Sequence, residues 1–439
     1  MGKTGLSCAR FLSRRGEKFM MVDSRTAPPE LARFQAGFPG VKIELGKFRE
    51  ATFRRAAQLM VSPGIGLQEP VIVDALNHGV PVTGDIDQFS KLAKAPIVAV
   101  TGSNGKSTVV SLVAEICEAA GVTFGLGGNL DGVRSRPALD LLEGDIPALY
   151  ILELSSFQLE TTAILGAEVA VILNLSEDHM DRYSGLRTYL EAKQRIFIGA
   201  RKVVVNRDSP YSRPPTQVDA EIIDFGLGEP GPRGFGVLQQ DGAEYLVLGR
   251  QLLARVDKLK VFGQHNVANV LAAMAIGKAL GLAPELMAAA ALQFRGLPDR
   301  CQWVAEIDGI EFYNDSKGTN VGATVAAVEG LGRKLEGKIV LIAGGVGKGA
   351  NFQPLVRPIT QFVRGVILVG EAAPQINEVL AAHKKISFAD SMEDAVAQAK
   401  AAANPGDAVL LSPACASFDM FRDFHHRGQV FTETVRVLQ

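Results

Sequence analysis

The segment Thr101-Gly102-Ser103-Asn104-Gly105-Lys106-Ser107-Thr108 contains the residue types that bind a phosphate group. Glycines let backbone N–H groups approach an anion, the lysine adds a positive charge, and a serine or threonine hydroxyl is a ligand for Mg²⁺. The usual form of this loop has another glycine where this chain has Val100, so the loop is a shortened version. The predicted phosphate-binding residues are Gly102, Ser103, Asn104, Gly105, Lys106, Ser107 and Thr108.

Two other groups with chemical potential follow apolar segments further along the chain. Glu153 comes directly after the apolar residues 149–152, and a carboxylate beside a phosphate loop is suited to hold Mg²⁺ directly or through water. His179 lies in the polar run 174–181, where its imidazole could bind a second metal or orient an amine. Each also has a structural interpretation, as a helix-start carboxylate or as a satisfied histidine. Spacing alone indicates a solvated cation for Lys193, which follows in a predicted helix.

The elements around the phosphate loop are predicted from hydrophobic periodicity. Residues 97–100 form a short apolar run typical of a buried strand, and apolar residues from 109 to 117 recur at helical spacing until Gly121. A strand, a glycine loop and a helix in this order place the positive end of the helix dipole at the anion. A turn that merely precedes a helix is the less favoured interpretation.

The N-terminal segment has the pattern of a partial nucleotide-binding unit. A predicted helix over residues 6–15 is followed by a strand over 19–22 that ends at Asp23, where an acidic residue would meet a ribose hydroxyl. No strand precedes Gly2, so we expect a Rossmann-like domain in which the first strand is missing. A nicotinamide cofactor is compatible with this segment.

After residues 294–300 the alternation of strands and helices begins again. Strands are predicted over residues 310–313, 339–342, 366–369 and 408–411, and glycine, hydroxyl or charged residues follow each of them. The carboxyl ends of parallel strands form a ligand-binding edge. A chain of 439 residues suggests about three domains. We therefore predict an α/β fold with three domains, over residues 1–85, 86–296 and 297–439.

Composition excludes several classes of protein. The net charge of -1 gives no support for a nucleic-acid-binding protein. No apolar stretch approaches the roughly 18 residues that span a bilayer. The four cysteines are far apart and form no C-x-x-C pair, which argues against a disulfide framework or a zinc site. Without a signal peptide, a reducing cytoplasm is the expected compartment.

Several of these segments, in this order, resemble the Mur ligases over essentially the whole chain. The resemblance rests on residues 101–108, 153–160, 177–183, 263–266, 297–300, 314–317 and 412–417. It implies a cytoplasmic step of peptidoglycan precursor synthesis, in a monomer that needs neither nucleic acid nor a membrane. ATP would phosphorylate the carboxylate of UDP-MurNAc-L-Ala, and the amine of D-glutamate would displace the phosphate from the acyl phosphate. Mg²⁺ at two sites is implied, with Mn²⁺ a possible substitute.

The resemblance also implies roles for individual residues, each matched to a family motif. The catalytic residues are Lys106, His179 and Lys193, and the metal ligands are Ser107, Glu153, His179 and, if it is carbamylated, Lys193, with Thr108 a weaker candidate. ATP would bind the phosphate loop together with Asn266, Asn269, Arg300 and Asp315. The UDP-sugar would bind Thr4, Asp23, Arg25, Ser62, Gly64 and Asn129. D-Glutamate would bind His179, Thr319, Lys348, Ser417 and Phe424.

The sequence departs from the family pattern at the start of the chain and at two later positions. Part of the first glycine motif is missing, which puts uridine binding in question. Val346 stands where some relatives have aspartate, and this change would soften the glutamate pocket. Asn351 replaces an acidic residue. Three alternatives remain: a nicotinamide-dependent oxidoreductase, a regulatory P-loop ATPase, and another Mur ligase or a folylpolyglutamate-synthase-like amide ligase. The oxidoreductase leaves the Gly-Lys-Ser loop and Glu153 without a role.

Overall fold

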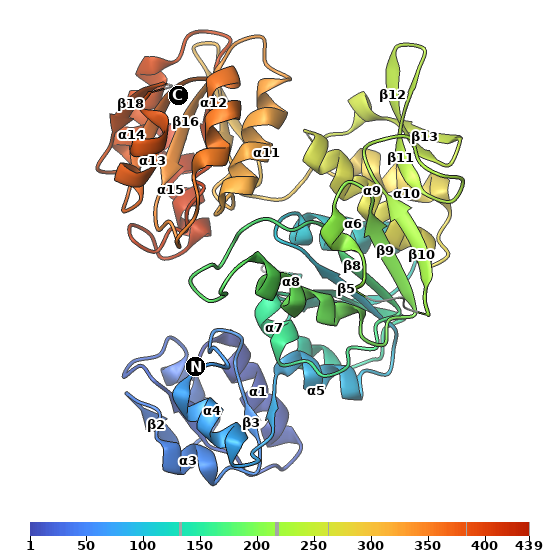
Figure 1. Cartoon of the computed structure of the whole chain (residues 1–439), viewed down its shortest axis with the longest axis vertical. Coiled ribbons are helices and arrows are strands. Elements are labelled where there is room, and N and C mark those ends of the chain that lie inside the picture. The colour runs from blue at the N-terminus through green and yellow to red at the C-terminus, as the bar shows by residue number, and fades with distance from the viewer. Residues whose placement is uncertain (131–133, 216–218, 262, 383, 439) are drawn as a thin grey trace.

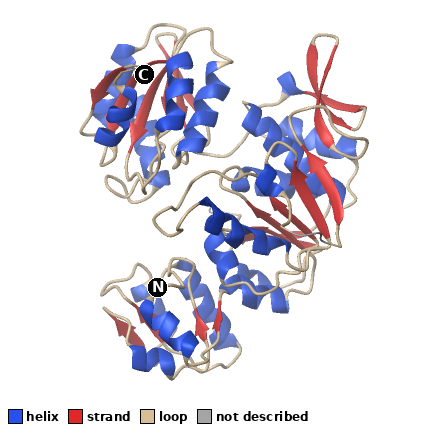
Figure 2. Cartoon of the chain, in the orientation of Figure 1, coloured by secondary structure: helices blue, strands red, loops and turns tan. Residues whose placement is uncertain are grey.

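The computed structural model of the protein describes residues 1–130, 134–215, 219–261, 263–382 and 384–438. Figure 1 shows three α/β lobes in chain order, with the N-terminal and C-terminal lobes on the same side of the central one. Figure 2 shows that each lobe combines strands with surrounding helices. Among the described residues, no helix is both long and apolar enough to cross a membrane.

The N-terminal domain contains two separate pairs of parallel strands. Its elements are α1 (Lys3–Arg14), β1 (Met21–Asp23), α2 (Leu31–Gly37), β2 (Ile43–Leu45), α3 (Glu50–Arg54), β3 (Leu59–Met60), α4 (Pro70–Asn77) and β4 (Val82–Thr83). β1 pairs with β2, and β3 pairs with β4. In residues 1–85, all of them described, no strand joins the two pairs. The described strands of this domain thus form two separate parallel pairs rather than one continuous sheet.

The central domain is built on a nine-stranded sheet in the order β13-β12-β11-β10-β9-β8-β5-β7-β6. Its strands are β5 (Ile97–Thr101), β6 (Phe124–Gly128), β7 (Leu149–Glu153), β8 (Val169–Ile172), β9 (Lys202–Asn206), β10 (Glu221–Phe225), β11 (Phe235–Gln240), β12 (Ala243–Leu248) and β13 (Gln251–Arg255). Its helices are α5 (Asp85–Leu92), α6 (Lys106–Ala119), α7 (Ser156–Glu160), α8 (Leu186–Gln194), α9 (Gln264–Ala279) and α10 (Pro284–Gln293), with a 3₁₀ helix η1 (Ala138–Leu142). β6 to β9 run parallel with β5, whereas β12 pairs antiparallel with β11 and β13.

β5 is buried on both faces because helices cover both sides of the sheet. Val98 and Val100 pack into a cluster with the apolar residues of α6 and α9. Ile97 and Ala99 face the opposite side, where they pack with Phe89 of α5. Successive side chains of a strand point to opposite faces, so a strand buried on both sides must be apolar throughout. The continuous apolar run that predicted this strand has this origin.

The C-terminal domain has a six-stranded sheet in the order β14-β15-β19-β16-β17-β18. Its strands are β14 (Gln302–Ile307), β15 (Ile310–Asn314), β16 (Ile339–Gly344), β17 (Val363–Val369), β18 (Lys385–Phe388) and β19 (Ala408–Leu411). Its helices are α11 (Val321–Gly332), α12 (Val356–Phe362), α13 (Ala373–Leu380), α14 (Met392–Ala402) and α15 (Phe424–Val437). Only the pairing of β14 with β15 is antiparallel. The polar residues that follow β15, β16 and β19 therefore share one edge, as predicted.

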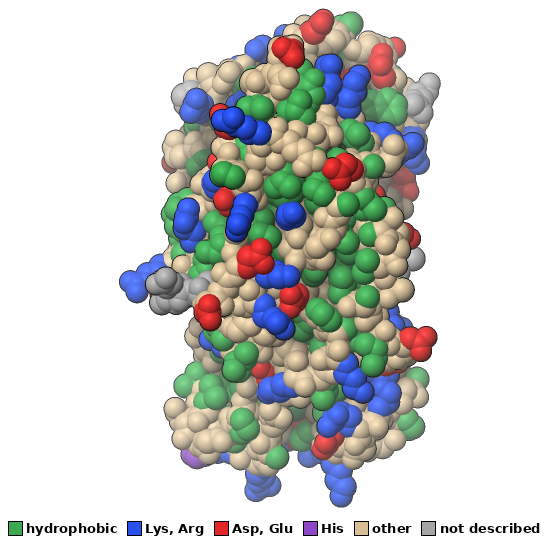
Figure 3. Space-filling model, turned by 90° about the vertical axis from the view of Figure 1, so that its right-hand side faces the viewer, with side chains coloured by type: hydrophobic (Ala, Val, Ile, Leu, Met, Phe, Trp, Pro, Cys, Tyr) green, Lys and Arg blue, Asp and Glu red, His purple; other side chains and the backbone are tan. Residues whose placement is uncertain are grey.

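Charge on the surface is mixed rather than gathered into one field. On the face shown in Figure 3, acidic and basic side chains are interspersed among apolar and neutral ones. This agrees with the formal net charge of -1.

Candidate active site

The phosphate loop joins β5 to α6, and α6 begins at Lys106. Gly105 has φ of 83°, a left-handed conformation that favours glycine. A Cβ atom at Gly105 would lie 2.3 Å from Oδ1 of Asn269, so glycine is also required by this close approach. The Asn269 amide donates to Oδ1 of Asn266 at 3.2 Å. The structure thus brings both predicted asparagines of α9 to the phosphate loop.

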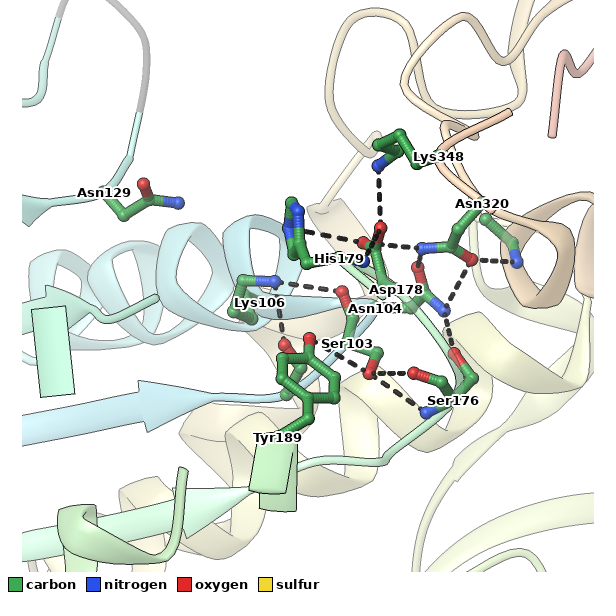
Figure 4. Close-up of polar contacts among 12 residues, drawn as sticks. Ser103, Asn104, Lys106, Asn129, Ser176, Asp178, His179, Tyr189, Asn320 and Lys348 are labelled. Atoms are coloured by element: carbon green, nitrogen blue, oxygen red, sulfur yellow. Dashed lines mark hydrogen bonds and ion pairs between the residues drawn. The ribbon is translucent and has the colours of Figure 1, made fainter. Parts of the chain in front are cut away.

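Lys106 is held against its own loop. Its Nζ donates to the carbonyl oxygens of Gly102 at 2.8 Å and Ser103 at 2.9 Å, as Figure 4 shows. Burial lowers the pKa of Lys106, while the nearby carboxylate of Glu153 raises it. The ammonium therefore stands at the N-terminus of α6, where helix dipole and backbone N–H groups favour an anion.

Ser107 and Glu153 form the oxygen-rich side of the site. The Ser107 hydroxyl donates to Oε2 of Glu153 at 2.6 Å, and the Asn129 amide donates to Oε1 of the same carboxylate at 2.9 Å. The guanidinium of Arg300, from the segment that leads into the third domain, donates to Oγ of Ser107 at 2.9 Å. Asn129, which was predicted on the UDP-sugar side, thus contacts the proposed metal ligand.

Lys193 is buried beneath the loop, with 1% of its surface exposed. Its Nζ donates to the Gly102 carbonyl at 3.0 Å and to Oγ1 of Thr101 at 3.4 Å, and it lies 4.5 Å from the centroid of the Tyr189 ring. Burial, together with the charge of Lys106, lowers the pKa of Lys193 well below its usual value. The interpretation from spacing alone, a solvated cation, is wrong.

His179 lies on a tight turn beside the loop, with φ of 58°. Its backbone N–H donates to Oδ1 of Asp178 at 2.9 Å, and its Nε2 lies 3.6 Å from Oδ2 of the same residue. The imidazole packs against the Phe157 ring at a centroid distance of 4.7 Å. Burial lowers the pKa of His179 to about 4, although Asp178 raises it. The imidazole is therefore neutral at pH 7, the form that can bind a metal.

Asp178 joins the central domain to the third domain. The Lys348 ammonium donates to Oδ1 of Asp178 at 2.7 Å. Burial raises the pKa of Asp178, but the charges of Lys348 and His179 outweigh this effect, so the net shift is downward. Ten per cent of the Asp178 side chain and 19% of the Lys348 side chain are exposed. This pair is a partly desolvated ion pair between two domains.

A reciprocal pair of amides joins the phosphate loop to α11. The Asn104 amide donates to Oδ1 of Asn320 at 3.3 Å, and the Asn320 amide donates to Oδ1 of Asn104 at 3.0 Å (Figure 4). Oδ1 of Asn320 also accepts from the backbone N–H of Ala323 at 2.9 Å and so caps α11. The Asn320 amide further approaches Oδ2 of Asp178 at 3.4 Å. One side chain therefore connects the helix cap, the loop and Asp178.

A small cavity of about 10 Å³ lies where the two domains meet. Its lining comprises Glu177, Asp178, His179 and Met180 of the central domain and Thr319, Asn320, Gly347, Lys348, Ala350 and Ala414 of the third. This volume holds about one water molecule. The cavity is therefore too small for an amino acid unless the residues that line it move apart.

Three of the residues predicted to bind D-glutamate meet at this cavity, and two do not. His179, Thr319 and Lys348 line it, whereas Ser417 and Phe424 are not part of its lining. The Phe424 ring lies 4.2 Å from Nζ of Lys317. The Ser417 carbonyl accepts from the backbone N–H of Phe421 at 2.8 Å.

Asp315 braces the start of the third domain. Its Oδ2 accepts from the Ser412 hydroxyl at 2.7 Å, and its Oδ1 accepts from the backbone N–H of Cys301 at 3.1 Å. Burial raises the pKa of Asp315 to about 7, while these hydrogen bonds and Arg300 oppose the shift. Asp315 therefore fixes the chain next to Arg300, which reaches the phosphate loop.

The other residues predicted on the UDP-sugar side lie in the N-terminal domain. Oδ1 and Oδ2 of Asp23 accept from Nε and Nη2 of Arg25, each at 2.9 Å, and the amino group of Met1 also pairs with Asp23. A Cβ atom at Gly5 would lie 3.8 Å from Oγ of Ser62, so the glycine segment and the Ser62 loop are neighbours. Thr4 and Gly64 belong to these same two segments.

Sequence reasoning assigned no role to Asp178 or Asn320, although both connect domains at the site. Asp178 was visible in the crowded run 174–181, and Asn320 ends the polar run 314–320. Nothing in either run indicates a partner more than 140 positions away. The separations of 170 residues for Asp178–Lys348 and 216 for Asn104–Asn320 appear only in the folded chain.

Together the fold and the site define a three-domain nucleotide-using enzyme with its reaction centre between a phosphate loop and the third domain. Three family models match in chain order. They are the Mur ligase MurD-like N-terminal domain at residues 1–84, the Mur ligase middle domain at 100–277, and the Mur ligase glutamate ligase domain at 299–415. The chain belongs to the Mur ligase family.

Individual relatives extend this result over the full length. The chain is 50% identical to UDP-N-acetylmuramoylalanine--D-glutamate ligase of Pseudomonas fluorescens, over 100% of this chain and 97% of the relative. It is 49% identical to the enzyme of the same name from Nitrosococcus oceani, over 99% and 95% of the two chains. The solved structure of MurC, a UDP-N-acetylmuramate-alanine ligase from Thermotoga maritima, has a TM-score of 0.64 at 18% identity and covers 100% of this chain and 98% of its own. The last match confirms the predicted three-domain fold.

Proposed function

We propose that the chain is an ATP-dependent ligase that joins D-glutamate to UDP-N-acetylmuramoyl-L-alanine. The full-length identity of about 50% to enzymes named for this reaction carries the proposal. The substrate carboxylate attacks the γ-phosphorus, ADP leaves, and an acyl phosphate forms. The D-glutamate nitrogen then attacks the acyl carbon, the tetrahedral intermediate expels phosphate, and the nitrogen loses a proton. A carboxylate is a poor electrophile, so phosphorylation supplies its leaving group.

The phosphate loop and Lys106 hold the triphosphate in this proposal. Lys106 already stands at the positive end of α6 and contacts only loop carbonyls through the hydrogen bonds of its Nζ described above. On nucleotide binding, its Nζ turns from the carbonyls to the phosphate oxygens. Arg300 reaches the same point from the third-domain side and adds a second positive charge. Such cations stabilise charge on a phosphoryl group in transfer. Asn266, Asn269 and Asp315 complete the nucleotide site.

Lys348 and Thr319 bind the carboxylates of the amino acid. Lys348 is charge-paired with Asp178 in the ligand-free chain, so an incoming carboxylate exchanges places with that of Asp178. His179 lines the same cavity. Because its imidazole is neutral at pH 7, it places no positive charge beside the incoming amine. Ser417 and Phe424 complete this subsite after a local rearrangement.

The residues around Ser107 fit Mg²⁺. Within the described residues, no three His, Cys, Asp or Glu side chains form a metal-binding group. Mg²⁺ is usually held by one or two carboxylates together with substrate phosphates, and the Ser107–Glu153 pair, with oxygens 2.6 Å apart, is of this kind. Mg²⁺, or Mn²⁺ in its place, neutralises phosphate charge when bound. The second site takes His179 and Lys193.

Lys193 contributes to the second site as a carbamate. The lowered pKa favours the neutral amine, whose nitrogen adds to the carbon of CO₂ with loss of one proton to water. The product is an anion that can bind a metal, which a buried ammonium cannot do.

The nucleotide sugar binds the N-terminal domain at Thr4, Asp23, Arg25, Ser62 and Gly64, while Asn129 reaches it from the central domain. The domains extend over residues 1–85, 86–296 and 297–439. The connections after β4, which ends at Thr83, and after α10, which ends at Gln293, support these limits. We further infer a monomer in the cytoplasm that acts on small molecules and uses neither nucleic acid nor a membrane.

A phosphate-release assay tests the proposal. UDP-MurNAc-L-Ala and ATP are supplied with one amino acid at a time, and phosphate release is expected with D-glutamate alone. Release that is independent of the amino acid would indicate an ATPase. Release with L-lysine or another amine would indicate a different ligase, and a requirement for a nicotinamide would exclude ligation.

A further inference from the structure

Arg182 of the central domain reaches into the N-terminal domain. Its Nη1 donates to the carbonyl of Pro63 at 2.6 Å, and its Nη2 donates to the carbonyl of Ile65 at 3.2 Å. Both carbonyls belong to the loop that follows β3 and contains Ser62 and Gly64. A single guanidinium thus binds both sides of a loop from another domain, 117 to 119 residues away in sequence.

The guanidinium is fixed from the central-domain side as well. Nη2 also donates to Oε2 of Glu160, at the end of α7, at 2.6 Å. The Tyr183 hydroxyl pairs with the other oxygen of this carboxylate. Only 13% of the Arg182 side chain and 13% of the Glu160 side chain are exposed. A planar guanidinium that is held by a carboxylate has little freedom to turn.

The same side chain supports the histidine of the reaction centre. The guanidinium carbon lies 4.0 Å from the centroid of the Phe157 ring, and that ring packs against the imidazole of His179. The backbone N–H of Arg182 donates to the His179 carbonyl at 3.0 Å. The 62–65 loop and His179 are therefore both positioned by contacts of one residue.

These contacts do not maximise stability. Within the described chain, Nε of Arg182 is buried and has no hydrogen-bond partner. A buried donor without an acceptor destabilises the folded state. The guanidinium therefore binds both loop carbonyls while its Nε–H is left without an acceptor.

We propose that Arg182 is a positioning residue that sets the distance between the nucleotide-sugar loop at residues 62–65 and the reaction centre. The inference rests on the proposed function, because it assigns the 62–65 loop to the nucleotide sugar. The carboxylate that is phosphorylated lies at the far end of a long substrate. A small displacement of the loop that holds the other end moves this carboxylate away from the γ-phosphate, and about 1 Å is enough to cost on the order of 10²-fold in rate.

The test compares Arg182→Gln with Arg10→Gln in the full chain. Arg10 is the matched control, because it is also an arginine at the junction of the first two domains. Its Nε lies 3.4 Å from Oδ1 of Asp140, a residue to which we assign no part in the reaction. Arg182→Gln should lower kcat/KM for UDP-MurNAc-L-Ala by about 10²-fold and leave KM for ATP within about twofold. Arg182→Lys should be intermediate, since the compact ammonium keeps the charge but lacks the planar fork of donors that spans the two loop carbonyls and Glu160. Arg10→Gln should leave all of these constants within about twofold.

Binding of UDP alone separates positioning from loss of structure. UDP lacks the part of the substrate that must reach the γ-phosphate, so its affinity should be equal in Arg182→Gln and the wild type. A parallel loss of UDP affinity would mean that the N-terminal domain itself is damaged and would overturn the proposal. An unchanged kcat/KM for UDP-MurNAc-L-Ala would also overturn it.

Amide hydrogen exchange gives a result that does not depend on the enzyme's substrate. In the ligand-free protein, the backbone amides of Ser62, Gly64 and Ile65 should exchange at least about tenfold faster in Arg182→Gln than in Arg10→Gln. Equal exchange in the two variants refutes the role of Arg182 even if the wild type proves not to ligate D-glutamate. If only the proposed function is wrong, the wild type will release no phosphate, but the two variants will still show the predicted difference in amide exchange.

Discussion

The central domain is joined to its two neighbours by contacts of different kinds. At the first junction, Ser7 and Arg10 of α1 bind Asp140 of η1, and Arg14 pairs with Glu143. We assign none of these residues a part in the proposed reaction. Arg182 is the residue of this junction to which we do assign one. At the second junction, the contacts are Lys348–Asp178, Asn104–Asn320 and Arg300–Ser107. Each of these includes at least one residue that we assign to a substrate or metal.

The difference indicates how the site is assembled. Docking of the third domain and completion of the reaction centre involve the same side chains, so a substrate that competes for one contact also changes the domain junction. The exchange that we propose, in which a carboxylate of D-glutamate takes the place of Asp178 at Lys348, is such a competition. At the first junction, the contacts of α1 with Asp140 and Glu143 involve no residue that we assign to a substrate or metal. Domain movement linked to binding is therefore expected at the second junction.

Substitution of Lys193, which belongs to neither junction, should cause the largest loss of turnover. Lys193→Ala removes the side chain that we propose as a metal ligand beneath the phosphate loop, and turnover should fall by about 10³-fold or more. If the residue acts as a carbamate, added short carboxylic acids should partly restore phosphate release by occupying the vacated space. Small-angle scattering of the ligand-free variant should match the wild type, because Lys193 contacts only the central domain. A lack of rescue by any carboxylic acid would count against the carbamate.

Lys348→Met should affect chemistry and domain arrangement together. It leaves the carboxylate of Asp178, whose side chain is 10% exposed, without its cation, and removes the partner of the amino-acid carboxylate. We expect kcat/KM for D-glutamate to fall by about 10²-fold and the radius of gyration without ligands to increase. The matched variant Arg14→Met breaks the more exposed Arg14–Glu143 pair and should alter neither quantity measurably. Equal radii for Lys348→Met and the wild type would show that this pair does not hold the junction.

Neither junction could be predicted from the sequence, although local parts of the candidate site could. The phosphate loop, Glu153 and His179 were identified because glycine, charge and strand ends form local patterns, and β5 was predicted from its apolar run. The burial of Lys193 was not predicted, since its helix carries charged neighbours at 191 and 195 and its environment comes from β5 and the loop. The partners of Asp178, Asn104 and Arg182 were inaccessible for the same reason. They lie in other domains, and no periodicity encodes the relative placement of two domains.

The Asn104–Asn320 pair should produce a smaller, coupled effect. Asn104→Ala removes its half of the pair, and Asn320→Ser removes the other half while keeping an N-cap residue for α11. Each single variant should lower kcat/KM for D-glutamate by about fivefold to tenfold. The double variant should lose less than the product of the two, with a coupling energy of about 0.5–1 kcal/mol. If the two losses in kcat/KM multiply fully in the double variant, the amides act separately and the pair does not couple the phosphate loop to the third domain.

The last prediction concerns stability rather than catalysis, at the domain connections after β4 and after α10, which we call the hinges. Here the two junctions should behave alike. Asp315 beside the second hinge has a pKa raised to about 7 by burial, and burial also raises the pKa of Asp85 at the start of α5. A carboxyl group with a raised folded-state pKa binds more protons folded than unfolded. Its contribution to stability is therefore greatest below the unfolded pKa of about 4 and declines as pH rises to 7.

Asp315→Asn cannot titrate, so its free energy of unfolding relative to the wild type should rise by about 2 kcal/mol between pH 5 and pH 8, measured by urea denaturation without ligands. Asp85→Asn should show a rise of the same sign. No change between pH 5 and pH 8 for either variant would mean that its carboxylate is already ionised in the folded chain at pH 5. If this relative free energy rises for both variants, the buried hinge carboxyls of the two junctions are equivalent. The difference between the junctions then lies in their charged contacts with the site, above all in the Lys348–Asp178 pair.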